Sequence, residues 1–255
     1  MKKIFITGAT DGLGFMAAEK LIEQGHQVVL HARNKTKAEI VHQKLPNAKA
    51  VVTGDLSSIS QTYKIAEALN RLGTMDSVIH NAGVGFKEPY QETEDALPHV
   101  FAINSLAPYI LSCLINKPKR LIYTSSGMHE QGDTKLEDLL WDKKKWNAAQ
   151  AYSDTKLHNI LLAFAVSKRW PDVFCNVVSP GWVATKMGGA HAPDDLEKAP
   201  ETQIWLSSSE EKDVQISGQF LYHKRPKNYL SAANDTQLQD RFIDFCESLT
   251  LIKIP

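Results

Sequence analysis

The stretch TGATDGLG, residues 7–14, decides how this sequence is interpreted. Three glycines fall within seven positions, directly after a short apolar run at residues 4–7 and before a helical pattern at residues 13–23. Glycine weakens regular structure because it loses more backbone entropy on folding than any other residue. The cluster therefore indicates a sharp strand-to-helix turn with a special backbone requirement.

Between a strand and a helix, each glycine of this turn has a physical use. Gly8 permits the tight turn, Gly12 lets the backbone approach a bound pyrophosphate, and Gly14 lets the helix lie close to the sheet. The helix N-terminus adds free N–H groups and a partial positive charge. Gly12-x-Gly14-x-x-Ala17 also satisfies the looser dinucleotide-binding pattern. The alternative is a plain strand-to-helix turn without a ligand.

Six short runs rich in β-branched and aromatic residues alternate with amphipathic stretches such as 59–72 and 148–168. Their apolar residues are consecutive, which is typical of parallel strands covered on both faces. The sequence therefore predicts an α/β fold with a doubly wound parallel sheet of about seven strands and helices on both faces. We expect one domain over residues 1–255. The runs are residues 4–7, 27–30, 50–53, 77–80, 120–124 and 174–178.

Two irregular regions follow predicted strands, at about residues 127–147 and 185–200. In open α/β sheets ligands bind beyond the carboxyl ends of the strands, so both loops are candidates for the rim of a substrate site.

Composition excludes several function classes. The 255 residues carry balanced charge, which argues against a nucleic-acid partner. Three scattered cysteines argue against a disulfide framework or a metal site and favour buried thiols. The first apolar stretch is too short for a signal peptide, and no run approaches the about 18 apolar residues of a membrane span. We expect a cytoplasmic protein.

The end of the second predicted strand bears on the choice of dinucleotide. About twenty residues past Gly12, where an NAD-binding domain usually places an acid, stand Arg33 and Asn34. A guanidinium can bind the 2′-phosphate of NADP through two hydrogen bonds. NADP is therefore the expected cofactor. NAD remains open, as does a simple surface role for Arg33.

Tyr152 and Lys156 stand four residues apart in a predicted helix and thus share one face. A lysine cation beside a phenol favours the phenolate, so we expect the pKa of Tyr152 to lie below its usual value of about 10. Tyr152 is then a candidate general acid/base for a carbonyl or alcohol.

With these motifs in order, the chain resembles the short-chain dehydrogenase/reductase family, which has a Rossmann fold. The resemblance runs from Thr7 to about Thr185. Beside the glycine turn and the Tyr152–Lys156 pair, it rests on Asp55-Leu56, Asn81-Ala82-Gly83, Asn104, Thr124-Ser125-Ser126 and the segment from Ser179 to Thr185.

The resemblance implies a role for each matched residue. Ser126, rather than Ser125, orients the substrate oxygen, Tyr152 passes the proton, Lys156 lowers the tyrosine pKa and holds the nicotinamide ribose, and Asn104 anchors a water in a proton relay. The implied cofactor-binding residues are Gly8, Thr10, Asp11, Gly12, Leu13, Gly14, Arg33, Asn34, Asp55, Leu56, Asn81, Ala82, Gly83, Tyr152, Lys156, Pro180, Gly181, Val183 and Thr185.

Several features refine the resemblance. The ending of the second strand and the segments near Trp205 and Gly218 are similar to the retinol-dehydrogenase-like branch. The loop before Tyr152 carries Trp141 and Trp146, which either line a substrate pocket or only pack the loop. Asp11 stands where NADP enzymes of the family sometimes carry a basic residue, which weakens the NADP expectation.

The implied activity is an NAD(P)-dependent oxidoreductase acting on a small, apolar carbonyl or alcohol. Two alternatives stay open: a same-fold isomerase or lyase, and a non-enzymatic NADP-sensing or scaffold protein. A homodimer or homotetramer is an open expectation as well. The apolar helix 152–170 would serve as its interface or, alternatively, only as core.

Overall fold

Apolar strands assemble into one sheet in the computed structural model, which describes residues 1–87 and 89–254. The sheet order is β3-β2-β1-β4-β5-β6-β7-β8, and the first seven strands of the chain run parallel. The predicted doubly wound parallel sheet is thereby confirmed. These strands are β1 (Lys3–Ile6), β2 (Gln27–Ala32), β3 (Ala50–Thr53), β4 (Ser77–His80), β5 (Arg120–Thr124), β6 (Phe174–Val178) and β7 (Phe220–Tyr222).

An eighth strand, β8 (Arg225–Pro226), extends the sheet beyond the predicted seven. It pairs antiparallel with β7 through a tight turn in which His223 and Lys224 have φ values of 48° and 61°. A two-residue strand that contains proline has no periodicity, and proline is tolerated only at a sheet edge. The sequence pattern therefore could not reveal it.

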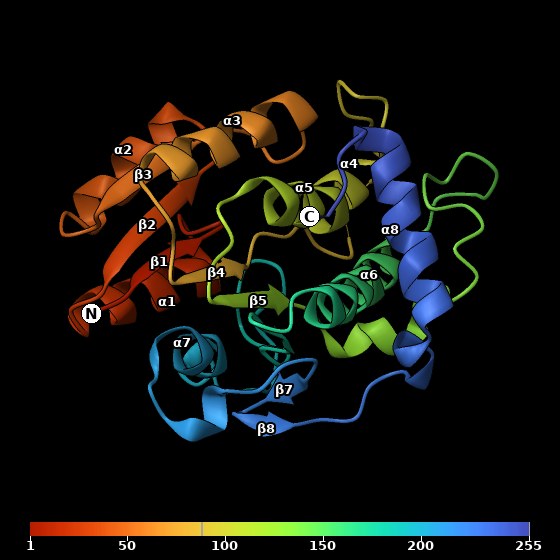
Figure 1. The fold of residues 1–255 in the computed structure, drawn as a ribbon. Coiled ribbons are helices and arrows are strands. Elements are labelled where there is room, and N and C mark those ends of the chain that lie inside the picture. Colours follow the sequence, from red (N-terminus) through yellow and green to blue (C-terminus); the bar gives the residue numbers. More distant parts are fainter. Residues whose placement is uncertain (88, 255) are drawn as a thin grey trace.

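Helices cover both faces of the sheet (Figure 1). One apolar core lies between the sheet and α3, α5, α6 and α8, and a second lies beneath α1, α2 and α7. In the described residues no helix is long and apolar enough to cross a membrane. The helices are α1 (Gly12–Glu23), α2 (Lys35–Lys44), α3 (Ile59–Arg71), α4 (His99–Phe101), α5 (Ala107–Leu114), α6 (Ala148–Arg169), α7 (Glu201–Ser208) and α8 (Thr236–Thr250).

Side-chain caps fix where the first three helices begin. Asp11, Asn34 and Ser58 each precede a helix and accept a hydrogen bond from one of its first backbone N–H groups. Such caps satisfy donors that have no partner within the helix. Each cap follows the carboxyl end of a strand, so the starts of α1, α2 and α3 gather at the same edge of the sheet.

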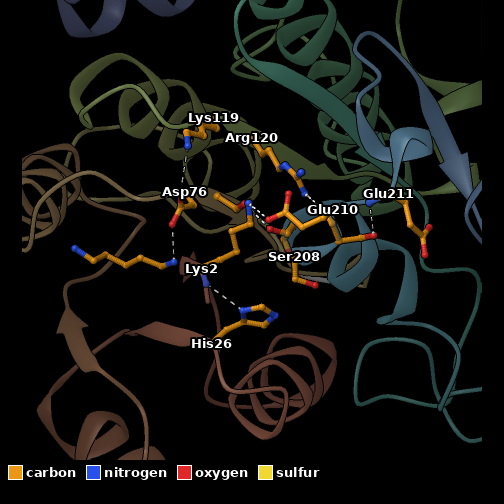
Figure 2. A network of polar contacts seen from close by, with 12 residues as sticks. Lys2, His26, Asp76, Lys119, Arg120, Ser208, Glu210 and Glu211 are labelled. Atoms are coloured by element: carbon orange, nitrogen blue, oxygen red, sulfur yellow. Dashed lines mark hydrogen bonds and ion pairs between the residues drawn. The ribbon is translucent and has the colours of Figure 1, made fainter.

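The opposite edge is held by a polar network that ties α7 to the strand starts (Figure 2). Buried Arg120, the first residue of β5, donates from Nη1 to the carbonyl oxygens of Leu206 and Ser209 at 3.0 and 2.7 Å. Lys2 Nζ forms an ion pair with Glu210 Oε1 at 2.6 Å. A guanidinium at a helix C-terminus satisfies carbonyls that the helix leaves open. The network thus fixes α7 against the sheet.

Helix α6 is core rather than an open surface. All residues from 151 to 166 are buried, and α8 crosses it on the side away from the sheet (Figure 1). Within the chain, α8 covers this side of α6, which agrees with a core role for the helix.

Two fully buried histidines stand in this core. His80 stacks on Tyr123 with ring centroids 4.6 Å apart, and His158 stacks on Phe242 at the same distance. Burial lowers the pKa of each imidazole to about 3, since the charged form would lose its hydration. Both histidines are therefore neutral in the folded protein at neutral pH.

We predict acid sensitivity from these histidines. Above pH 6.5 the unfolded imidazoles are also neutral and no stability is lost. Between about pH 6.5 and 3 the unfolded chain takes up protons that the native state cannot. Each histidine then lowers the free energy of unfolding by about 1.4 kcal/mol per pH unit. Urea unfolding from pH 7.5 to 5.5 measures this slope.

The matched variants are His158→Gln and His42→Gln. The first should flatten the slope by the contribution of one histidine. The second alters an exposed histidine of α2 and should leave the slope unchanged. Equal slopes in His158→Gln and the unmodified protein would show that His158 is not kept neutral by burial.

Candidate active site

A cleft of about 660 Å³ lies at the carboxyl edge of the sheet. Its walls come from the turns after β1, β2, β3 and β4, from α6, and from the segment after β6. Fifteen of the sequence-predicted site residues line it: Gly8, Thr10, Asp11, Gly12, Leu13, Arg33, Asp55, Leu56, Asn81, Ala82, Gly83, Tyr152, Lys156, Pro180 and Thr185.

The glycine turn forms the floor of this cleft, and each glycine meets a different constraint. A Cβ on Gly14 would collide with the Gly8 carbonyl oxygen and the Asn81 side chain. Gly8 has φ +65°, and a Cβ there would lie 2.9 Å from Cα of Ala82. Gly12 has φ +54°, and nothing lies within 4 Å of the Cβ it lacks. The turn is therefore closely packed at Gly8 and Gly14 and has open space at Gly12.

The turn after β4 locks onto the glycine turn. Asn81 Nδ2 donates to the Thr7 carbonyl oxygen at 3.0 Å, and the Ala82 N–H donates to Thr7 Oγ1 at 2.9 Å. These bonds hold two neighbouring strand ends together beside the N-terminus of α1. The open space over Gly12, next to helix N–H groups, fits the phosphates of a dinucleotide.

His31 supports the glycine turn from below, and the sequence interpretation did not assign it. Its Nδ1 accepts a hydrogen bond from the Gly8 N–H at 3.1 Å, so Nε2 carries the proton and donates to the Gly54 carbonyl oxygen at 2.8 Å. Burial lowers the pKa of His31, which keeps the ring neutral. The ring thus joins the ends of β1 and β3 beneath the cleft.

Other lining residues had no role assigned from the sequence, because no motif marks their positions. They are Phe15 and Met16 of α1, Val84, His99, Ile103, and Lys186, Met187 and Leu196 of the segment after β6. Thr124, Ser125 and Ala184 also line the cleft and belong to the matched motif segments, but no cofactor contact was expected of them. Only the folded chain brings them to the cleft.

Arg33 and Asp55 line the cleft, and Asn34 follows Arg33 at the start of α2. Arg33 lines the cleft with an exposed side chain, whereas Asn34 caps α2 by accepting from the Lys37 N–H at 3.0 Å. Asp55 accepts hydrogen bonds from the N–H and hydroxyl of Ser57 at 2.9 and 2.7 Å. The carboxylate is thus held by its own turn, while the guanidinium of Arg33 borders the cleft.

Tyr152 and Lys156 lie together at the other end of the cleft. Lys156 Nζ lies 5.2 Å from the centre of the Tyr152 ring and donates to the Thr124 carbonyl oxygen at 3.1 Å. The hydroxyl of Ser125 donates to the Lys156 carbonyl oxygen at 2.7 Å and is therefore already used. The Ser126 hydroxyl accepts a hydrogen bond from the Met128 N–H at 3.3 Å and lies close enough to Tyr152 to act on the pKa of its phenol.

The expected lowering of the Tyr152 pKa is wrong for this structure. Burial raises the pKa of Tyr152 to about 12, and the neighbouring Ser126 hydroxyl only partly offsets this. Burial also lowers the pKa of Lys156 to about 8. Desolvation outweighs charge attraction because both groups lie inside the protein. At neutral pH the phenol keeps its proton.

Asn104 lies in a widened helical turn between α4 and α5, the π-helical residues Ala102–Leu106. Its Oδ1 accepts from the Val84 N–H at 2.8 Å, and Nδ2 donates to the Val84 carbonyl oxygen and Thr155 Oγ1, each at 3.1 Å. Such single π-turns are frequent at functional sites. Here the turn directs a buried amide at the backbone behind Gly83.

The remaining six predicted residues are not among those that line the cleft. Gly181 has φ +86°, and Asp194 approaches it too closely for a Cβ. Val183 is buried and pairs with Asp194 in a short parallel bridge. Together with Gly14, Asn34, Asn104 and Ser126, these residues shape the surrounding structure.

Trp141 and Trp146 do not line the cleft. Their ring centroids lie 5.1 Å apart, and Tyr90 meets Trp146 at 5.3 Å. They border a separate hollow of only about 10 Å³ beside Phe101 and His158. Of the two roles left open for these tryptophans, the structure supports packing of the loop.

Comparison with known proteins establishes the family. Residues 2–127 match the model of the short chain dehydrogenase family. Over its whole length the chain is 39% identical to short-chain dehydrogenase chry4 of Gibberella zeae and 42% identical to an uncharacterized oxidoreductase of Emericella nidulans, covering 99% of each. The chain belongs to the short-chain dehydrogenase family and is an oxidoreductase.

The expected retinol-dehydrogenase-like resemblance also appears, at lower identity. Human retinol dehydrogenase 14 is 28% identical over 96% of this chain and 85% of its own. Among solved structures, a protein from Mycobacterium paratuberculosis superimposes with a TM-score of 0.87 over 100% of this chain and 95% of its own, at 24% identity. A blue fluorescent protein in complex with NADPH superimposes with a TM-score of 0.68 over 86% of this chain and 95% of its own, at 19% identity. These similarities confirm the predicted fold.

The support beneath the glycine turn generates a prediction. His31→Ala removes the acceptor for the Gly8 N–H and the donor for the Gly54 carbonyl oxygen. Leaving a buried group unpaired costs about 1–3 kcal/mol, so the free energy of unfolding should fall by that amount. Hydrogen exchange of the Gly8 amide should also accelerate. Urea unfolding and amide exchange by NMR measure both effects.

His42→Ala is the matched control, because His42 is exposed on α2. It should change neither quantity. An unchanged exchange rate at Gly8 in His31→Ala would contradict the assigned hydrogen bond.

Proposed function

We propose that the protein reduces the carbonyl group of a small, apolar substrate with NADPH. The observation that carries this proposal is the position of the Tyr152 phenol at one end of a dinucleotide-sized cleft. There it lies beside Lys156 and Ser126 and keeps its proton at neutral pH. The chain would form one domain, and the same cleft would hold both the cofactor and the substrate.

Arg33 and the glycine turn support the choice of NADP. The space over Gly12 and the start of α1 accommodates the pyrophosphate, and Arg33 stands where a 2′-phosphate would extend from the adenosine end. Leu56, Asn81 and Ala82 line the same cleft. The NADPH complex of a protein with this fold, the blue fluorescent protein, agrees with this assignment. Bound reduced nicotinamide supplies the hydride for the reaction.

Tyr152 would act as the general acid. Its pKa of about 12 keeps the phenol protonated at neutral pH, which suits donation of a proton to a developing alkoxide oxygen. The Ser126 hydroxyl, which stands beside Tyr152, would orient the substrate oxygen. Ser125 is not available for this role because its hydroxyl is bound to the backbone of Lys156.

Lys156 and Asn104 would hold this acid in place. Lys156 Nζ lies beneath Gly83, where a Cβ would come within 3.4 Å of it, and Asn104 Oδ1 lies 3.3 Å from the same point. The ammonium group can therefore reach both the ribose side of the cleft and the tyrosine. Asn104 fixes the turn that contains Gly83 and Val84.

The side of the cleft near Tyr152 is apolar. Phe86 meets the Tyr152 ring edge-on with centroids 5.9 Å apart. Met187 packs so closely on Gly85 that a Cβ there would lie 2.8 Å from its Cγ. This rim favours an apolar substrate.

Tyr152→Phe tests the proposed acid. The variant keeps the ring packing but removes the proton donor, so kcat for carbonyl reduction should fall by about 10²–10⁴-fold. Affinity for NADPH should hardly change. NADPH oxidation with a panel of aldehydes, ketones and quinones measures the rate. Tyr90→Phe, at a partly exposed tyrosine outside the cleft, is the control and should be fully active.

Equal rates in Tyr152→Phe and the unmodified protein would overturn the proposed mechanism. Binding of NADPH without turnover of any carbonyl compound would favour the alternatives, a same-fold isomerase or lyase or a nucleotide-sensing protein.

Arg33→Ala tests the choice of cofactor. A charge-assisted hydrogen bond contributes about 1.5–3 kcal/mol, so the Kd for NADPH should rise at least about tenfold. The Kd for NADH should stay the same because NADH lacks the 2′-phosphate. Arg71→Ala changes an exposed arginine at the end of α3 and should alter neither value. Tighter binding of NADH than NADPH by the unmodified protein would refute the NADP assignment.

A further inference from the structure

Lys186 connects the two walls of the cleft across the glycine turn. It follows Thr185 in the segment after β6, and its Nζ forms an ion pair and hydrogen bond with Oδ2 of Asp11. Asp11 is the cap of α1 and stands directly before Gly12. Both Lys186 and Asp11 line the cleft, so this ion pair lies where the opposite walls meet.

The segment that carries Lys186 has a defined structure. The Trp182 N–H donates to Asp194 Oδ2 at 2.6 Å, and the Gly189 N–H donates to the Thr185 carbonyl oxygen at 2.9 Å. Trp182 Nε1 also donates to the Gly188 carbonyl oxygen at 2.9 Å. These bonds fold the segment on itself and hold the backbone of Lys186 at one place.

Two further contacts join this part of the chain to α1. Lys20 Nζ donates to the Glu197 carbonyl oxygen at 3.0 Å, and Gln203 Nε2 lies 3.5 Å from the Leu13 carbonyl oxygen. The segment thus contacts the last turn of α1 through Glu197, and α7, which follows it, contacts the first turn through Gln203. Of the three side chains that make these contacts, Lys186 is the one that binds a residue of the glycine turn, Asp11.

The negative charge of Asp11 gives the positive charge of Lys186 a use beside the glycine turn. The glycine turn offers N–H donors to a phosphate, yet the carboxylate of Asp11 stands beside it and would repel the anion. Lys186 compensates for that charge, and its hydrogen bond holds the pKa of Asp11 below its usual value. The four-carbon stem of lysine lets the ammonium group shift toward a second anion while its backbone stays fixed.

We propose that Lys186 is a cofactor-binding residue for the pyrophosphate that NAD(H) and NADP(H) share, with Asp11 holding its ammonium group over the glycine turn. This inference rests on the proposed use of a nicotinamide dinucleotide. This role differs from that of Arg33. A contact with the pyrophosphate strengthens the binding of both dinucleotides, whereas a contact with the 2′-phosphate strengthens the binding of NADP(H) alone.

The test compares three ligands by isothermal titration calorimetry: NADPH, NADH and adenosine 2′-monophosphate, which lacks the pyrophosphate. Lys186→Met removes the charge and keeps most of the stem. It should raise the Kd for NADPH and for NADH by the same factor, about tenfold. It should leave the Kd for adenosine 2′-monophosphate unchanged. Lys186→Arg should restore dinucleotide binding to within about threefold of the unmodified protein.

Lys198→Met is the matched control, since Lys198 lies in the same part of the chain and forms an exposed ion pair with Asp195. It should change none of the three values. The side chain of Lys186 is 86% exposed, so Lys186→Met should also retain the unfolding free energy of the unmodified protein.

Three outcomes would overturn the inference: unchanged Kd values for both dinucleotides in Lys186→Met, weakening of NADPH and adenosine 2′-monophosphate without NADH, or weakening equalled by Lys198→Met. In each of them the unmodified protein still binds a dinucleotide, so the proposed function stands. Failure of the unmodified protein to bind either dinucleotide would instead refute the proposed function.

Discussion

The close approach of Gly14 to the carbonyl oxygen of Gly8 is the constraint on which the rest of the site depends. No side chain fits between these two backbone segments, so α1 begins almost against the end of β1. Asn81 uses the same narrow space to bind the Thr7 carbonyl oxygen, which brings the end of β4 to the turn. His31 completes the arrangement from β2. Contacts from three adjacent strands therefore shape a turn that leaves open space only above Gly12.

Desolvation has a comparable influence at the other end of the cleft. Tyr152 and Lys156 belong to a helix that is buried along most of its length, and burial disfavours the charged form of each. The phenol therefore retains its proton while the ammonium group loses its proton more readily than usual. The same physical effect keeps His80 and His158 neutral in the core. Burial therefore sets the protonation state both of the proposed acid and of these two core histidines.

Periodicity and motif order were sufficient to predict the parallel sheet, the glycine turn and the convergence of Arg33, Tyr152 and Lys156 on one cleft. These features depend on local sequence, since consecutive apolar residues define buried strands and glycine marks positive φ. The pKa of Tyr152 was predicted in the wrong direction because four-residue spacing reveals a neighbouring charge but not the depth of burial. His31 and Lys186 were missed because their partners, Gly8 and Asp11, are distant in sequence. Only tertiary structure brings each pair together.

Helix α8 covers α6, and it follows every strand of the sheet in the chain. Helix α6 carries Tyr152 and Lys156, but Phe242 and its neighbours on α8 close its outer face. During translation every strand of the sheet leaves the ribosome before α8 does, because domains are made from the N-terminus. Until then α6 presents an uncovered apolar side, and the stacking partner of His158 is missing. The helix that bears the proposed acid therefore gains its outer cover only after every strand of the sheet has been synthesised.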